Sequence, residues 1–403
     1  MPVVEAHWRN TPSVESRRNN RRARRYLPAW GSIALSLALA VMLLSPAWAP
    51  NTVVRAPVVS ASLGGVGDNI APELKTRMAA APTQFLPIIV ELKPLPAPFP
   101  PRENELLAQH ALTLLTQFGV PVGGLALIGS AAGWATSTGI TSISLDPQVA
   151  YIDFDATVHV STTPPNPYGW QVPLSTAYPL AVEADRVWWQ QGLTGTGTAV
   201  AVLDSGVIAD LDLTQPTNRL IASVNFADDR GGMADAGGHG SHVAGIIGGN
   251  GSASSGEYVG IAPGVNLVDV RVLGRNGAGR ISSVVRGIEW VLAHRTVYNI
   301  RLINLSLGMP ALPSYRANPL DAAVEIAWLR GVAVVAAAGN GGPNQGAVDA
   351  PGDDPYVITV GATDDNGTPR TSDDVLAWYS SWGTPAGSTA KPDVVAPGRR
   401  IVS

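Results

Sequence analysis

The chain has 403 residues, of which 45% are hydrophobic and 14% charged, with 43 glycines and no cysteine. This length predicts two folded units, and the composition excludes a largely disordered or fibrous protein. The lack of cysteine excludes disulfides, thiolate zinc sites and cysteine nucleophiles. The net charge is -4, and because residues 1–49 are rich in arginine the remainder is more acidic still, which argues against nucleic acid as the main partner.

The first 49 residues have the pattern of an export signal. An arginine-rich stretch precedes an apolar run from Ala29 to Leu44, and the small-residue segment Ala47-Trp48-Ala49 follows. This order predicts a signal peptide over residues 1–49, although Pro50 after the small-residue site leaves a retained signal anchor open. We therefore expect a secreted protein whose only membrane contact is through this signal or anchor.

A small α+β module is expected after the signal. Residues 50–83 have no clear hydrophobic period and predict a linker, and residues 84–160 predict the module itself. Within it, Leu86 to Lys93 is rich in β-forming residues, whereas Glu103 to Phe118 has apolar residues at helical spacing.

Two further strands and a boundary complete this module. The segments GLALIG (124–129) and SISLDPQVAYIDFD (142–155) predict strands. Prolines between Ser161 and Tyr168 exclude a helix or a central strand there, so we place the domain boundary at this segment. The second domain then covers residues 168–403.

The second domain alternates short apolar runs with helical segments. Runs that are apolar on both faces predict strands of a parallel sheet covered by helices. The fold class is therefore α/β, with a doubly wound, mainly parallel sheet whose ligands bind at the carboxyl ends of the strands. The predicted strands are TAVAVLD (198–204), LVDVRVL (267–273), RLINLSLG (301–308), VAVVAAAGN (332–340) and YVITVGAT (356–363).

Three polar residues stand out at the ends of these runs. Asp204 follows the first strand, His239 begins a helix of small residues, and Asn340 follows a buried strand. Taken singly, Asp204 and Asn340 have plain structural explanations as a turn aspartate and a turn asparagine. His239 and His242 could bind a metal as a His-x-x-His pair, but a third ligand and the H-E-x-x-H pattern are missing, which favours a single catalytic imidazole. We interpret Ser205, beside Asp204, as a turn residue rather than a nucleophile. Asp204, His239 and Asn340 together, each within its own extended motif, are hard to obtain by chance.

The surrounding motifs resemble the subtilisin-like serine peptidase family. The matching motifs are AVLDSG, HGSHVAG, GIAPG (260–264), INLSLG (303–308), AAAGN and KPDVVAPG (391–398). This resemblance implies that Asp204 is the orienting acid, His239 the general base, Asn340 the oxyanion-hole donor and His242 a structural residue.

By the same resemblance, the substrate is a polypeptide bound as an added strand. The backbone segments implied to hold it are Gly277, Ala278, Gly279 and Ser306, Leu307, Gly308. A rival interpretation makes GRNGAG (274–279) a dinucleotide-binding loop. Its glycine spacing differs from G-x-G-x-x-G, and no acidic residue ends a following strand about twenty residues on.

The family's nucleophile stands in a Gly-Thr-Ser-x-Ala segment. By analogy with the family's triad, it is expected on the order of twenty residues after KPDVVAPG. We therefore expect the serine beyond Ser403, and we interpret GSTAKP (387–392) as a loop. The alternative is a non-catalytic pseudoprotease whose groove still binds peptides.

The small module resembles the family's propeptide, most closely in LDPQVAYIDFD (145–155). This resemblance implies that residues 84–160 assist folding and inhibit the enzyme until they are cleaved off between about Ala156 and Tyr168. A structural domain without an inhibitory role is the alternative. The expected product is a monomeric enzyme released from a zymogen.

No cofactor is required for this chemistry, and we assign no metal ligand. Structural calcium is a weaker expectation, with Asp212, Asn250 and the loop GSASSG (251–256) as candidates. The acids Asp228, Asp229 and Asp235 are explained equally well as solvated loop residues or as calcium ligands.

Overall fold

The computed structural model describes residues 68–95, 102–161, 176–229, 232, 235–311, 314–343, 346, 348–383 and 389–403. The expected signal or anchor lies outside these residues, as do most of the expected linker and of the proline-rich boundary. Across the described ranges, no helix has both the length and the apolar character that a membrane span needs.

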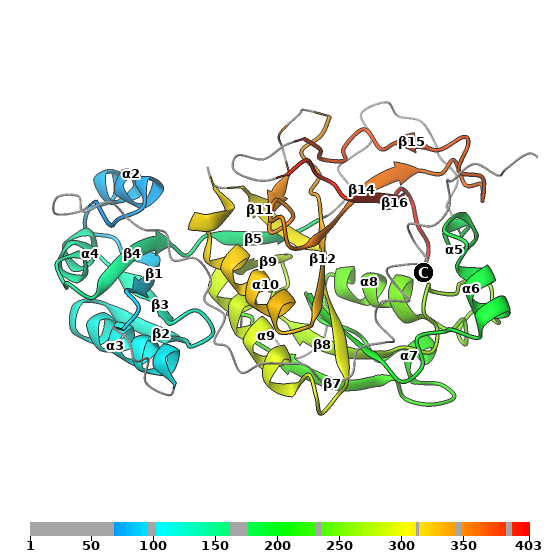
Figure 1. The fold of residues 1–403 in the computed structure, drawn as a ribbon, viewed down its shortest axis with the longest axis horizontal. Coiled ribbons are helices and arrows are strands. Elements are labelled where there is room, and N and C mark those ends of the chain that lie inside the picture. Colours follow the sequence, from blue (N-terminus) through cyan, green and yellow to red (C-terminus); the bar gives the residue numbers. More distant parts are fainter. Residues whose placement is uncertain are drawn as a thin grey trace, which may run out of the picture. The chain divides into compact units, whose positions relative to one another are not determined.

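The N-terminal module is an antiparallel sheet with strand order β2-β3-β1-β4 (Figure 1). Its strands are β1 (Leu86–Leu92), β2 (Val120–Leu125), β3 (Ser130–Ala135) and β4 (Val149–Phe154), and its main helices are α3 (Glu103–Phe118) and α4 (Ser137–Ser144). The expected strand at 86–93 and the expected helix at 103–118 are therefore confirmed.

The module also begins earlier than predicted. Helix α2 (Pro72–Ala80) lies inside the expected linker, and Leu74 is its buried residue. Ile70 forms a β-bridge with Ile152 of β4. This helix was missed because a polar helix with one buried position leaves little hydrophobic period in the sequence.

Two predicted strands in the module were wrong in extent. Residues 126–129 form the turn between β2 and β3, and residues 142–144 end α4. In α4, Ile140 and Ile143 are fully buried three residues apart. Short apolar runs of this kind do not distinguish a strand from a buried helical turn.

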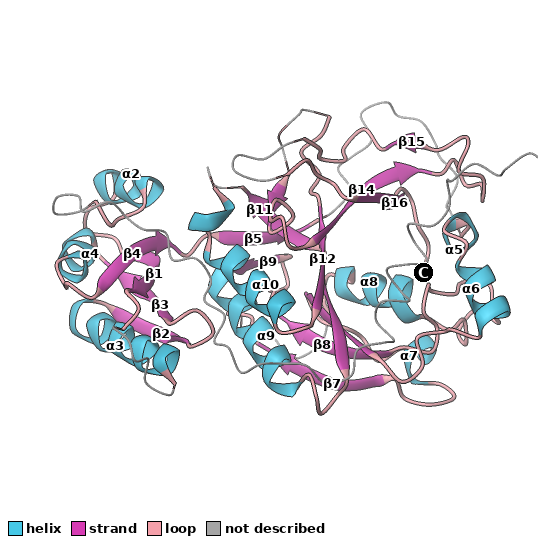
Figure 2. Cartoon of the chain, viewed as in Figure 1, coloured by secondary structure: helices cyan, strands magenta, loops and turns pink. Residues whose placement is uncertain are grey.

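The second domain is built on an eight-stranded sheet with the order β15-β14-β12-β10-β6-β8-β7, and β16 pairs with β14 (Figure 2). All pairs are parallel except β14 with β15, which confirms the doubly wound, mainly parallel fold. The strands are β6 (Ala199–Asp204), β7 (Leu220–Asn225), β8 (Asn266–Arg271), β10 (Ile300–Leu305), β12 (Ala333–Ala337), β14 (Ile358–Asp364), β15 (Val375–Leu376) and β16 (Val394–Pro397).

Helices cover both faces of this sheet. On β6, Ala201 and Leu203 belong to the core cluster that includes α9, whereas Val202 packs with Ala244 of α8. Because alternate residues of a strand point to opposite faces, α9 and α8 lie on opposite sides. The helices are α5 (Tyr178–Ala181), α6 (Ala184–Gln191), α7 (Leu211–Thr214), α8 (His239–Gly248), α9 (Ile281–His294), the 3-10 helix η2 (Tyr315–Ala317) and α10 (Pro319–Leu329).

A third, smaller sheet joins the two modules. Its order is β13-β11-β5-β9, with β5 (Thr157–Val160), β9 (Ala278–Arg280), β11 (Leu307–Pro310) and β13 (Asp349–Ala350). The strand β5 ends the N-terminal module, while its two neighbours belong to the second domain. The end of one module is thus an internal strand of the other.

Candidate active site

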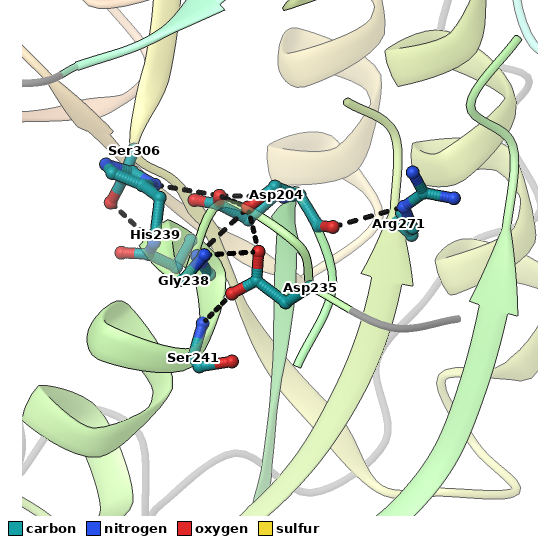
Figure 3. A network of polar contacts seen from close by, with 10 residues as sticks. Asp204, Asp235, Gly238, His239, Ser241, Arg271 and Ser306 are labelled. Carbon is teal, nitrogen blue, oxygen red and sulfur yellow. Dashed lines mark hydrogen bonds and ion pairs between the residues drawn. The ribbon is translucent and has the colours of Figure 1, made fainter. Parts of the chain in front are cut away.

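Asp204 and His239 meet at the carboxyl end of β6. Asp204 is the last residue of that strand and is 1% exposed, and His239 is the first residue of α8. The Nδ1 atom of His239 lies 2.8 Å from Oδ1 of Asp204 (Figure 3). Because an ionised carboxylate only accepts hydrogen bonds, Nδ1 is the donor, and Nε2 is left as the atom that can accept a proton.

Asp235 is bonded to the residues on either side of His239. It is therefore not a solvated loop acid. The side chain is 4% exposed. Its carboxylate accepts hydrogen bonds from the backbone N–H groups of Gly238 and Ser241, at 2.9 and 2.8 Å, and from the hydroxyl of Ser205 at 2.9 Å. Asp235 therefore caps the start of α8 and fixes the turn that presents His239.

Asp229 is also bonded rather than solvated, whereas Asp228 is exposed, as a solvated loop acid would be. Asp229 forms an ion pair at 2.8 Å with the fully buried Arg271, whose Nε donates to the carbonyl of Ser205 at 3.1 Å. Asp228 lies 3.3 Å from Arg280. Sequence alone could not separate these acids, because several stand within one glycine-rich loop and their partners are distant in the chain.

Opposing influences set the pKa of His239. Burial of the ring lowers it, whereas the hydrogen bond and the charge of Asp204 raise it. A backbone hydrogen bond to Ser161 and the charge of Asp235 raise it further, and the net pKa lies above the ordinary imidazole value. The backbone group of Ser161 is the carbonyl, since only an acceptor favours the protonated ring.

Ser306 and Asn340 follow neighbouring strands of the same sheet. Ser306 comes directly after β10, and Asn340 lies three residues beyond the end of β12. Since β10 lies between β6 and β12, three adjacent strand ends carry Asp204, Ser306 and Asn340. Figure 3 draws Ser306 in the same network of polar contacts as His239 and Asp204. This is the edge at which open α/β sheets bind ligands.

The strand β5 runs past this edge between two strands of the second domain. Val158 is opposite Gly279 on one side, and Gly308 is opposite His159 on the other. The N–H of Val160 donates to the Gly277 carbonyl at 2.9 Å. The six residues predicted to bind substrate backbone all border this strand or the residue that follows it: Gly277, Ala278, Gly279, Ser306, Leu307 and Gly308.

Known proteins share this arrangement of motifs. The model of the Subtilase family matches residues 195–402. Serine protease AprX of Bacillus subtilis (strain 168) is 39% identical over 218 residues, which cover 53% of this chain and 49% of that protein.

The chain belongs to the subtilase family.

Further relatives of this subtilase include an alkaline protease of Alkalihalobacillus alcalophilus, 35% identical over 264 residues that cover 66% of the chain and 59% of the relative. Subtilisin Savinase of Lederbergia lenta is 37% identical over 213 residues, which cover 53% of the chain and 68% of the relative. The chain thus spans about half to three fifths of the length of the first two relatives.

In this subtilase the glycine-rich segment 274–279 does not form a nucleotide loop. Its end is strand β9, and the backbone of Gly277 and Gly279 faces β5. Ile281 begins α9 directly after this strand. The dinucleotide interpretation is therefore wrong, because these glycines allow the backbone of this segment to approach the backbone of β5 closely.

The side chains expected to hold calcium are bonded to backbone groups of other segments of the chain. Oδ1 of Asp212 accepts from the N–H of Ala253 at 2.6 Å, and Nδ2 of Asn250 donates to the carbonyl of Gln215 at 2.6 Å. In the described part of the chain, no group of three histidine, cysteine or acidic side chains could hold a metal ion. Calcium binding by this subtilase stays a prediction, and no step below depends on it.

Proposed function

We propose that this subtilase is a secreted serine endopeptidase that processes its own precursor and whose nucleophilic serine follows residue 403 in the full-length protein. The observation that carries the proposal is the 2.8 Å contact between His239 and Asp204. Next to it, strand β5 pairs with β9 and β11 in the way that an extended substrate would. No other described histidine is aligned with a buried carboxylate at a strand end of the main sheet.

The chemistry follows from this pair. Nε2 of His239 takes the proton of the serine hydroxyl while the serine oxygen attacks the substrate carbonyl carbon. Asp204 fixes the tautomer and stabilises the imidazolium, and the side-chain amide of Asn340 donates to the oxyanion. The proton then passes to the leaving amine as the peptide bond breaks, and water hydrolyses the acyl-enzyme by the same two proton transfers.

The reading frame beyond codon 403 tests the proposal. A Gly-Thr-Ser-x-Ala segment there, together with fluorophosphonate labelling of the natural protein, is the expected result. A stop codon, or a full-length protein that does not react with fluorophosphonate, would instead leave a peptide-binding pseudoprotease.

The N-terminal module is assigned here as an inhibitory propeptide cleaved at the bond after Ser161. The N–H of Ser161 donates to the carbonyl of Ser306 at 3.0 Å, and its own carbonyl is bonded to His239. Ser161 therefore occupies the place of the residue whose carbonyl is attacked. An added strand of this kind is held by its backbone, so the segment fits a groove made for polypeptides.

The propeptide also binds the start of α9. Oδ1 of Asp155 accepts from the N–H of Ser282 at 3.1 Å, and Oδ2 accepts from the Ser282 hydroxyl at 2.7 Å. A carboxylate at a helix N-terminus is stabilised by the unpaired N–H groups there. Burial nevertheless raises the pKa of Asp155 to about 6, against the lowering effect of the bonds to Ser282 and of the charge of Arg280.

We expect the propeptide to bind more weakly as the pH rises. A carboxyl whose pKa is raised in the complex takes up a proton on binding, so its contribution is complete in acid and is lost as the pH passes about 6. The inhibition constant of residues 68–161 against the mature enzyme should rise by about tenfold or more between pH 5 and pH 8.

The matched variant for this prediction is Asp155→Asn. It keeps an acceptor for Ser282 but removes the titrating group, so the inhibition constant should change less with pH. Equal pH dependence in both proteins would rule out Asp155 as a cause, and no inhibition at micromolar concentration would favour a purely structural module.

The plot of kcat/KM against pH should fall on its acidic side because His239 becomes protonated. The protonated ring cannot accept the serine proton, so kcat/KM should fall about tenfold for each pH unit below the pKa of His239. Because Asp204 raises that pKa, the fall should begin above the ordinary imidazole pKa. The test is the pH profile of the full-length enzyme, and a flat profile from pH 5 to 8 would contradict the assignment of His239 as base.

A further inference from the structure

Asp349 lies between the two segments that frame the proposed reaction centre. It begins β13, where Pro310 of β11 is its partner. Its backbone N–H donates to the carbonyl of Ala338, two residues before Asn340, at 3.0 Å. The residue is therefore tied to the substrate-binding strand on one side and to the Asn340 loop on the other.

The carboxylate occupies space that two glycines leave open. A Cβ atom on Gly308 would lie 3.0 Å from Cβ of Asp349, and a Cβ on Gly339 would collide with the Asp349 carboxylate. Gly339 has a φ of 99°, which L side chains rarely adopt. The carboxylate thus reaches the backbone wall formed by Gly308 and Gly339, directly before the oxyanion-hole residue Asn340.

This carboxylate has no cationic partner in the described part of the chain. Some acids of this domain are paired, as Asp229 is with Arg271. Other buried acids, such as Asp269 and Asp321, form no ion pair among the described residues either. Asp349 differs from them by its place beside Gly308 and Gly339. Among the residues that the structure describes, none forms a hydrogen bond or ion pair with the Asp349 side chain, which is partly buried. Burial alone raises its pKa to about 6. A desolvated carboxylate without a partner favours binding of a cation.

We propose that Asp349 lies at the base of the pocket for the substrate side chain that precedes the cleaved bond, and that it selects arginine or lysine there. The inference rests on the proposed function. Ser161 is held at His239 by the N–H bond to Ser306, and Ser306 leads into the strand that carries Asp349 on its other edge. An acid at the base of such a pocket sets a preference for basic side chains in other serine proteases.

The precursor's own residue at this place is short. The hydroxymethyl group of Ser161 fills less of the pocket than a long side chain, which agrees with an Asp349 carboxylate that remains unpaired. Processing does not need that contact, because a segment of the same chain reacts at high effective concentration. Substrates from solution have no such advantage and depend on the pocket for selection.

Peptide substrates that differ only in this residue test the proposal. For the full-length enzyme, kcat/KM for an arginine peptide should exceed that for the leucine peptide by about 100-fold or more. In Asp349→Asn the arginine value should fall at least about 100-fold while the leucine value changes little, as expected for loss of one member of a desolvated charge pair. Asp373→Asn, which removes an exposed loop acid, is the matched control.

A second measurement does not require the serine. The fluorescent cation p-aminobenzamidine should bind to the 403-residue chain, and Asp349→Asn should lose this binding whereas Asp373→Asn retains it. In the precursor, Ser161→Arg should process faster than Ser161→Gln, and Asp349→Asn should remove that difference.

The outcomes separate the two proposals. Cleavage with a preference for leucine that Asp349→Asn leaves unchanged would overturn the role of Asp349 and leave the protease assignment intact. If the enzyme cleaves nothing but binds p-aminobenzamidine in a way that depends on Asp349, the protease assignment would be overturned and the cation pocket supported. Absence of both would overturn the two together.

Discussion

Replacing His239 by alanine in the full-length protein should lower kcat by about 10⁶-fold, the size of effect that removal of the general-base histidine has in subtilisin. The physical reason is the loss of the base that we propose takes the serine proton. Asp204→Asn should cost less, about 10⁴-fold, because an amide holds the ring in the wrong tautomer but leaves it in place. Both variants should also accumulate unprocessed precursor.

The control for this prediction stands one turn along the same helix. His242 is exposed, and its Nε2 lies 3.2 Å from the carbonyl of Ile401. His242→Ala should therefore retain activity within about tenfold, since exposed positions away from the reacting atoms have small effects. Normal propeptide release by His239→Ala would remove this histidine from the mechanism, whatever its distance from Asp204.

The parts of the fold that the sequence predicted are those with strong local patterns. The apolar run before Asp204 predicted β6 because a strand buried on both faces needs an unbroken apolar segment. The spacing in Glu103–Phe118 predicted α3 because one helix face is buried. By contrast, β7 (Leu220–Asn225) was missed, since its residues are mostly only partly buried and include polar side chains.

The same reasoning explains what sequence could and could not say about the site. Motifs identified Asp204 and His239, because each stands at the boundary of a regular element. Asp235 was not identified, since its role depends on folding back under the first turn of α8. Asp349 carried no signal either, because its position depends on pairing between β13 and β11.

Proline at position 161 should abolish self-processing, with cleavage at least about 100-fold slower than in the unaltered precursor. Proline has no N–H, so the hydrogen bond from residue 161 to the Ser306 carbonyl is lost. The ring also fixes φ of the residue that must lie extended at His239. Mass spectrometry of the products, expected to end at Ser161 in the unaltered protein, measures both the rate and the bond cleaved.

Ser161→Ala separates the backbone from the side chain in this prediction. Alanine keeps the N–H donor and removes only the hydroxyl, so cleavage after residue 161 should continue at a rate within about threefold of the unaltered precursor. Proline and alanine variants that process equally well would show that β5 is not held as a substrate. A product ending elsewhere would move the reacting bond away from the Ser161 carbonyl. If alanine processes and proline does not, the backbone bond to Ser306 is what places that carbonyl at His239.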